Sequence, residues 1–122
     1  MPQLTRNFRS EEFSCPCCGL DTIDPDLVDN LQHSRDAVGV PYPINSGCRC
    51  EKHNREEGGA KDSAHTPREN GICMAADIGC TDMLTRKKIL ADVTRRFRHI
   101  GIAKTFIHVD DDPEKPDGIY LY

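Results

Sequence analysis

Residues 72–78 read Ile-Cys-Met-Ala-Ala-Asp-Ile, a short apolar run interrupted by one carboxylate, Asp77. Its length is typical of a β-strand rather than of a helix. A second run, Thr-Phe-Ile-His-Val at residues 105–109, is rich in β-prone residues and carries His108. Burying an ionisable side chain within a strand is costly unless it finds a partner. The two runs therefore predict two strands that each hold a polar side chain in need of a partner.

The rest of the chain alternates between helix and strand signals. Asp24 can cap a helix that starts with Pro25, and the apolar stripe of this helix ends near Gly39. A second main helix, capped by Thr81 or Asp82, has apolar residues at every fourth position. The expected elements are helices at 25–39, 52–57 and 82–100, and strands at 42–46, 72–78, 105–109 and 118–122. This order predicts an α+β fold with a small, largely antiparallel sheet and two main helices.

The length of 122 residues fits one domain, because a single core typically serves about 100–150 residues. No internal repeat or low-complexity tract divides the sequence. Residues 1–23 lack a clear periodic pattern and contain a cysteine-rich run at 15–19. We expect a single domain over residues 1–122, with residues 1–23 as a cysteine-bearing arm packed on it.

The charge balance excludes some classes of partner. A formal net charge of −4 argues against a general nucleic-acid binder, which would need a basic face to collect phosphates. No window is apolar enough to span a bilayer, and residues 1–20 lack the apolar core of a secretory signal. We expect a monomer without a signal peptide and with neither nucleic acid nor a membrane among its partners.

Seven cysteines are heavy usage for a chain of this size, and an odd number cannot all pair within it. Cys15 and Cys18 have the two-residue gap of a zinc knuckle, and Cys48 and Cys50 could supply two further sulfur ligands. A structural zinc site, one or two disulfides between the arm and the loop near 48–50, and free thiols all remain open. We expect Cys73 and Cys80 to be core residues, and His53 is a further potential ligand near Cys50.

A second group of metal-ligand residue types lies outside the cysteines. His65 follows a polar, glycine-containing loop, whereas Asp77 and His108 each interrupt an apolar strand. Two imidazoles and one carboxylate leave a coordination position for water, which is the pattern of catalytic rather than structural zinc. The sequence therefore predicts one catalytic zinc ion held by these three side chains, besides the structural zinc that the cysteines would allow.

The ordered motifs resemble those of the M15 family of peptidases, which are D-alanyl-D-alanine carboxypeptidase-like enzymes. The likeness rests on Ser-Gly-Cys-Arg at 46–49, Ser-Ala-His at 63–65, Ala-Ala-Asp-Ile at 75–78 and Phe-Ile-His-Val-Asp at 106–110. It looks closest to the short phage and bacterial branch that acts on peptidoglycan. The resemblance implies a zinc peptidase with the family fold, and it matches His65, Asp77 and His108 to the ligands. It also implies that Arg49 and Ser63 bind substrate, with Arg49 acting in catalysis.

Two departures from the family pattern affect the site. The distance in sequence from His65 to Asp77 is longer than is usual for the family, which indicates an insertion at residues 66–70 that could reshape the substrate rim. Thr105 stands where many relatives carry an acid, three residues before the last ligand. Asp110 shares a strand face with His108, so we expect Asp110 to be the general base. A hydrogen bond from a histidine ligand to Asp110 is the alternative role.

The resemblance implies a peptidase that cleaves peptide bonds in peptidoglycan stem peptides or cross-bridges, with those peptides as its partner. Such a protein would serve phage or prophage lysis, cytoplasmic until it is released to the cell wall, or carried in a virion. The alternative is a module of the same fold that keeps zinc, lacks the base and only binds cell-wall peptides. A third hypothesis is a zinc scaffold built on cysteines alone, without a site at His65.

Overall fold

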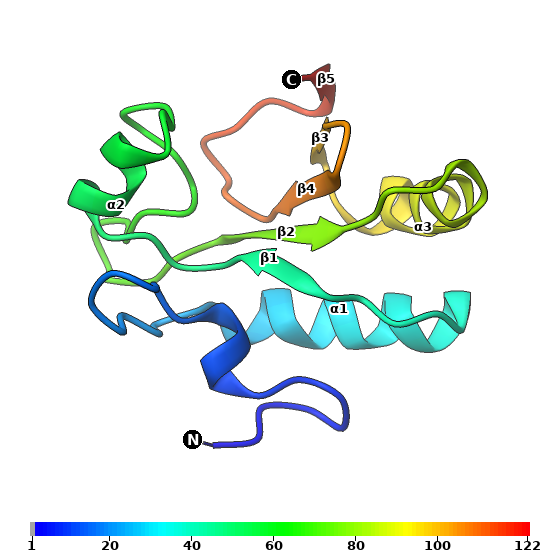
Figure 1. The fold of residues 1–122 in the computed structure, drawn as a ribbon, viewed down its shortest axis with the longest axis horizontal. Coiled ribbons are helices and arrows are strands. Elements are labelled where there is room, and N and C mark those ends of the chain that lie inside the picture. The colour runs from blue at the N-terminus through cyan, green and yellow to red at the C-terminus, as the bar shows by residue number, and fades with distance from the viewer. Residues whose placement is uncertain (1) are drawn as a thin grey trace.

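The computed structural model describes residues 2–122 and contains a five-stranded sheet with helices packed against it (Figure 1). The elements are the 3-10 helix η1 (Ser10–Phe13), the helices α1 (Pro25–Val38), α2 (Glu51–Glu56) and α3 (Met83–Arg96), and the strands β1 (Ile44–Ser46), β2 (Ala75–Gly79), β3 (His99–Ile102), β4 (Phe106–Asp110) and β5 (Gly118–Leu121). The strand order is β1-β2-β4-β3-β5, and every pairing is antiparallel except β3 with β5. The predicted α+β class and largely antiparallel sheet are confirmed.

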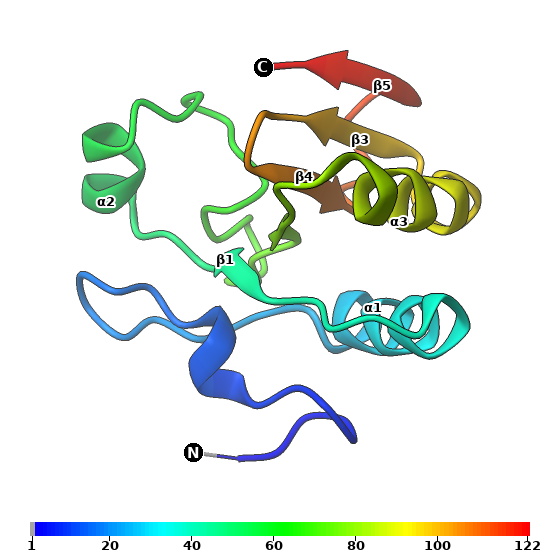
Figure 2. The same ribbon diagram turned by 45° about the vertical axis from the view of Figure 1, so that its right-hand side comes forward.

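The two faces of the sheet differ sharply in chemistry. Along β4, Ile107 and Val109 enter the core, where they join Leu27 and Leu31 of α1 and Ile89 of α3. Successive side chains of a strand point to opposite faces, so the polar members of β2 and β4 lie on the face away from α1 and α3. In both ribbon views α2 stands on the opposite side of the molecule from α3 (Figures 1 and 2). One face of the sheet thus anchors the helices, and the other is free to carry a site.

The caps of the main helices follow the sequence signals at their starts. The Asp24 side chain accepts a hydrogen bond from the Asp26 N–H, and Gly39 ends α1 with a left-handed φ of 77°. At α3 the Asp82 side chain accepts from the Thr85 N–H. Both helices therefore begin at the predicted caps.

The end of α3 differs from the prediction, which extended this helix to about residue 100. The helix stops at Arg96, and residues 99–102 form β3 between β4 and β5. The backbone turns extended at Phe97, with φ −122° and ψ 142°. Hydrogen bonding to two neighbouring strands outweighs the weak local helix preference of this segment.

The N-terminal arm is tied closely to the loop that follows β1. Phe8 and Phe13 are fully buried in the core, with ring centroids 5.6 Å apart. The Phe13 carbonyl accepts a hydrogen bond from the Cys48 N–H at 2.8 Å. The arm therefore packs on the rest of the fold. Among residues 2–122, no helix is both long and apolar enough to cross a membrane.

One disulfide joins the loop to the segment that leads into β2. Cys48 is bonded to Cys73, and their Cα atoms are 5.4 Å apart. This corrects two expectations, because Cys73 is not a plain core cysteine and Cys48 is not available as a thiolate ligand. A pairing between residues 25 positions apart depends on the tertiary approach of two segments, which cysteine spacing does not reveal.

The disulfide should contribute measurably to stability. Cys73→Ala is expected to lower the free energy of unfolding by about 3 kcal/mol, because a closed loop of this length constrains the unfolded chain. Denaturant titration without reductant measures the difference, with Cys80→Ala as the control for loss of a buried free thiol. Reductant should lower the free energy of unfolding of the wild-type protein to that of Cys73→Ala. A difference in free energy that remains after reduction would contradict the assignment of the disulfide.

Candidate metal centre and the pocket above it

Three buried polar side chains meet on the open face of the sheet. The Nε2 atom of His65 lies 3.1 Å from Oδ1 of Asp77 and 3.2 Å from Nδ1 of His108. Nδ1 of His108 lies 3.0 Å from the same Asp77 oxygen. All three residues are nearly inaccessible to solvent. The structure therefore brings together the three residues predicted as metal ligands.

Strand register and a pinned loop produce this convergence. Asp77 and His108 are directly opposite each other in the β2–β4 pair, so their side chains share one face. His65 lies in the loop between α2 and β2, where hydrogen bonds hold its own carbonyl and that of Ala64. The Ala64 carbonyl accepts from the Met74 N–H and the His65 carbonyl accepts from the Arg49 N–H, each at 2.8 Å.

Hydrogen bonds behind the two imidazoles decide which nitrogen of each ring carries hydrogen. Nδ1 of His65 donates to the Gly47 carbonyl at 2.7 Å, which leaves Nε2 with its lone pair. Nε2 of His108 donates to Oδ2 of Asp110 at 2.7 Å, which leaves Nδ1 with its lone pair. Both lone pairs point at each other and at the Asp77 carboxylate. Such a cluster is stable only with a positive charge at its centre.

The geometry of the three donor atoms fits a metal ion. In a tetrahedral zinc site with Zn–N and Zn–O bonds near 2.0–2.1 Å, neighbouring ligand atoms are about 3.3 Å apart. The donor triangle formed by Nε2 of His65, Oδ1 of Asp77 and Nδ1 of His108 has sides of 3.0, 3.1 and 3.2 Å. It therefore matches one face of such a tetrahedron and leaves the fourth vertex for another ligand.

The electrostatics of the cluster favour a cation. Burial raises the pKa of Asp77, but the contacts with His108 and His65 outweigh it and hold that pKa far below its ordinary value. Burial lowers the pKa of His108, but the carboxylates of Asp110 and Asp77 outweigh it and raise that pKa. In the metal-free chain a proton on His108 can supply the positive charge, and a bound metal would replace this proton.

Asp110 lies behind His108 rather than in front of the donor triangle. Its Oδ2 accepts hydrogen bonds from His108 and, at 2.6 Å, from Nδ1 of His99, and its Oδ1 accepts from the Asp112 N–H. The residue is 1% exposed. This arrangement favours the alternative role of holding a ligand ring in place over that of general base. Sequence reasoning missed His99, because β3 was read as the end of a helix.

The Arg49 guanidinium lies beside the donor triangle and contacts Asp77. Its guanidinium donates to Oγ of Ser46 at 3.0 Å, to Oδ1 of Asn54 at 3.3 Å and to Oδ2 of Asp77 at 3.3 Å. The buried Asn54 side chain of α2 also donates to the Ala60 carbonyl. The helix α2 thus fixes Arg49 against the back of the Asp77 carboxylate while one side of the arginine faces the pocket.

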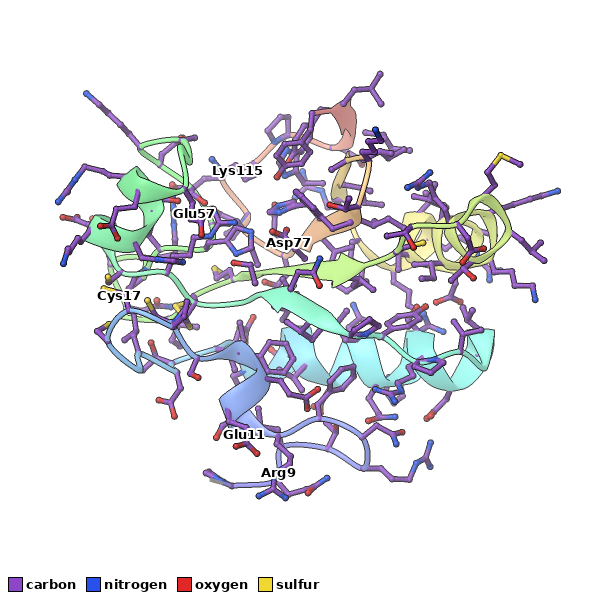
Figure 3. All side chains as sticks on the ribbon, in the orientation of Figure 1. Arg9, Glu11, Cys17, Glu57, Asp77 and Lys115 are labelled. Carbon is purple, nitrogen blue, oxygen red and sulfur yellow. A yellow bond between two sulfur atoms is a disulfide. The ribbon has the colours of Figure 1, made fainter. Side chains whose placement is uncertain are left out.

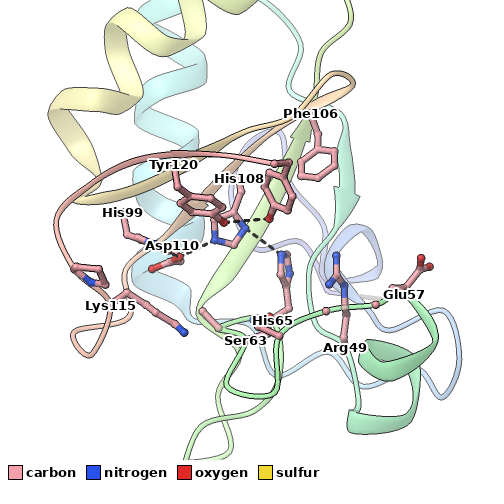
Figure 4. A pocket seen from close by; sticks show the side chains of 16 residues that line it. Arg49, Glu57, Ser63, His65, His99, Phe106, His108, Asp110, Lys115 and Tyr120 are labelled. Atoms are coloured by element: carbon pink, nitrogen blue, oxygen red, sulfur yellow. Dashed lines mark hydrogen bonds and ion pairs between the residues drawn. The ribbon is translucent and has the colours of Figure 1, made fainter.

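A pocket of about 670 Å³ opens above these residues (Figure 4). Its wall includes the predicted Arg49 and Ser63, and further side chains that sequence reasoning did not single out: Glu57, His99, Phe106, Lys115, Tyr120 and Tyr122. The hydroxyls of Tyr120 and Tyr122 lie 3.1 Å apart. The period-two spacing of these tyrosines was a sequence signal that both occupy one strand face.

Gly101 makes room for this aromatic wall. It lies between His108 and Tyr120 in the sheet register. A Cβ atom at Gly101 would come within 2.5 Å of Cζ of Tyr120, so any larger residue would displace the ring. The Tyr120 ring also stacks on His99, with centroids 4.9 Å apart. The observed position of the Tyr120 ring on the pocket wall therefore requires a glycine at position 101.

A family model for Peptidase M15 matches residues 6–110. The chain belongs to the M15 peptidase family. The match includes His65, Asp77, His108, Arg49 and Ser63, and it ends before β5. A comparison with curated proteins finds no match. Membership confirms the resemblance read from the sequence and places the chain among peptidases.

Within this M15 peptidase, the two departures from the family pattern have structural outcomes. Residues 66–70 form a turn that does not line the pocket, although Arg68 pairs with Asp112 and Glu114 of the loop between β4 and β5. Thr105 is exposed and lines a separate surface hollow with Pro43 and Gly79. The insertion therefore contacts the rim only indirectly, and position 105 does not face the donor triangle.

The orienting role of Asp110 gives a measurable expectation. Asp110→Asn should weaken zinc binding about 10–100-fold, because the carboxylate that fixes the His108 ring is lost. Competition with a chromophoric chelator measures the affinity, with the exposed Asp117→Asn as the matched control. Unchanged zinc affinity together with lost turnover would instead identify Asp110 as the general base.

Proposed function

We propose that this chain is a zinc-dependent peptidase that hydrolyses peptide bonds in peptidoglycan stem peptides or cross-bridges. The observation that carries the proposal is the triangle of His65, Asp77 and His108 donor atoms, with both histidines lining an open pocket. A zinc ion held by these three residues would polarise the scissile carbonyl and lower the pKa of an attacking water. The residues around the triangle would then bind and orient the substrate.

Arg49 and Ser63 are suited to holding the substrate backbone. One guanidinium nitrogen of Arg49 donates to Asp77, and the side chain also lines the pocket. There it can bind a carboxylate or a carbonyl oxygen of the substrate. The Ser63 Oγ accepts a hydrogen bond from the His65 N–H at 3.1 Å. Its own O–H is therefore available to donate to a substrate oxygen. We assign substrate binding to both residues and catalytic oxyanion support to Arg49.

The upper wall of the pocket fits a peptide that carries both apolar and acidic groups. Tyr120, Tyr122 and Phe106 offer aromatic surface, and Lys115 adds a cation on the side opposite Arg49 (Figure 4). Stem peptides combine alanine side chains with free carboxylates, so cations on two sides of the pocket would orient such a chain. This chemistry supports a wall peptide as the substrate class.

The mechanism needs a general base to accept a proton from the attacking water, and the sequence predicted Asp110 for this role. Among residues 2–122, the carboxylates that line the pocket are those of Asp110 and Glu57. Asp110 is buried and its oxygens already accept three hydrogen bonds. The Glu57 side chain is 56% exposed at the rim, and its Oε1 lies 3.5 Å from Nε2 of His53. We therefore propose that Glu57 takes the proton of the attacking water and passes it to the leaving amine, while Asp110 orients His108.

The cellular role that we propose is phage or prophage lysis, with the protein held in the cytoplasm until it reaches the wall, or carried in a virion. The support for this role is the resemblance to the short peptidoglycan-directed branch of the family. A module that binds wall peptides without cutting them is the second candidate, and the exposed position of Thr105, away from the pocket, favours it.

Purified peptidoglycan separates the two candidates. The zinc-loaded protein should release free amino groups from it, and His65→Ala or His108→Ala should abolish release because a ligand is lost. The exposed His33→Ala is the matched control and should behave as wild type. If the protein sediments with peptidoglycan but releases no amino groups, the chain is a binding module.

The proposed base can be tested independently of the metal. Glu57→Gln should lower kcat about 100-fold or more with zinc content unchanged, because general base catalysis typically contributes that much. The neighbouring exposed Glu56→Gln provides the control. Turnover close to that of the wild type in Glu57→Gln would remove Glu57 from the mechanism and return the role to another group.

A further inference from the structure

Three free thiols from distant parts of the sequence meet at the junction of the arm and α2. The sulfur atoms of Cys15, Cys18 and Cys50 all lie within 4.8 Å of one another. The Cys15 and Cys50 sulfurs are 3.8 Å apart. Figure 3 shows sulfur atoms gathered beside Cys17, at the far left end of the ribbon from α3. This cluster is separate from the His65 centre and has no part in the proposed peptide hydrolysis.

The arm contributes a tight turn of the kind that presents two sulfurs to one ion. Cys15 and Cys18 are separated by two residues and followed by Gly19 at a φ of 79°. The Gly19 N–H donates to the Cys15 carbonyl and the Cys15 N–H donates to the Leu20 carbonyl, each at 2.7 Å. These bonds close the turn and direct both thiols toward Cys50.

A backbone N–H group faces one of the three clustered sulfurs. The Cys50 sulfur, at the N-terminal cap of α2, accepts from the His53 N–H at 3.4 Å. Such a donor stabilises a sulfur that carries negative charge, as a zinc-bound thiolate does.

We propose that Cys15, Cys18 and Cys50 bind a second, structural zinc ion, with Cys17 as the fourth ligand. In a tetrahedral site with Zn–S bonds near 2.3 Å, neighbouring sulfurs are about 3.8 Å apart, which is the distance observed between Cys15 and Cys50. The Cys17 thiol is exposed and lies in the same turn, next to Cys18, so it can complete the set. Each thiol releases its proton to solvent on binding, and no oxidation or reduction takes place.

The arrangement suits an ion better than a disulfide. A disulfide would engage two sulfurs at about 2.05 Å and leave the others without a partner, whereas the structure gathers several sulfurs at longer distances. Cys48, two residues before Cys50, is already bonded to Cys73. The neighbouring disulfide therefore does not compete for the cluster.

Such an ion would fix the loop that carries Arg49. Cys50 directly follows Arg49 in the chain, and the arm already contacts this loop through the Phe13 carbonyl. Zinc would join the arm, the start of α2 and the neighbour of Arg49 in one rigid unit. Its role is structural, because none of the three clustered cysteines lines the pocket above His65.

Zinc stoichiometry tests the site directly. Protein purified under mild reduction should hold two zinc ions per chain by mass spectrometry of metals, and the double variant His65→Ala/His108→Ala should hold one. Adding Cys18→Ser to that double variant should remove the remaining ion, whereas adding Cys80→Ser, a free cysteine outside the cluster, should not. Because the histidine site is absent from all three variants, the result does not depend on whether the chain is a peptidase.

A second measurement does not require the cysteine variant to fold. Cobalt added to the metal-free His65→Ala/His108→Ala protein should give intense sulfur-to-metal charge-transfer absorption in the near ultraviolet, and Cys17→Ser should weaken cobalt binding at least tenfold. Cobalt spectra without sulfur bands, or a native mass that shows a Cys15–Cys50 disulfide, would overturn the proposal. Unchanged cobalt affinity in Cys17→Ser would remove Cys17 as the fourth ligand.

Discussion

The antiparallel register of β2 with β4 is the constraint on which the rest of the site depends. It sets Asp77 opposite His108, and a slip by one residue would turn one of them into the core. The register is strongly specified, because Ala76 and Ile78 of β2 and Ile107 and Val109 of β4 must face the hydrophobic core. The same apolar pattern that stabilises the sheet therefore positions two of the three donor side chains.

The third donor and the side chains that we propose to bind substrate depend on a loop that is held at several points. The disulfide to Cys73, the Phe13 carbonyl and the Ala64–Met74 hydrogen bond all restrain the segment between β1 and β2. Long loops lose much entropy when they are ordered. Covalent and buried attachments offset that loss, so His65 and Arg49 can hold fixed positions although neither lies in a strand.

Groups behind the donor residues set the orientation of the two imidazole rings. The Gly47 carbonyl and the Asp110 carboxylate each accept a hydrogen bond from one imidazole, and this decides which nitrogen faces the centre. Asp110 was expected as a base because period-two spacing puts it on the face of His108. Spacing shows which face of a strand a carboxylate occupies, but not which side of the neighbouring imidazole it contacts. The contact with His99 holds Asp110 on the side of the His108 ring that faces away from the donor triangle.

The sequence by itself determined the fold class and the helix starts, because caps and apolar periodicity are local signals. It also singled out the three residues that the structure brings together, because two of them interrupt apolar strands. Tertiary structure alone decided β3, the Cys48–Cys73 bond, the contacts of His99 and the aromatic wall. Each of these depends on contacts between segments far apart in the chain, whose free energies exceed local preferences. The donor residues could therefore be read from the sequence, and their surroundings could not.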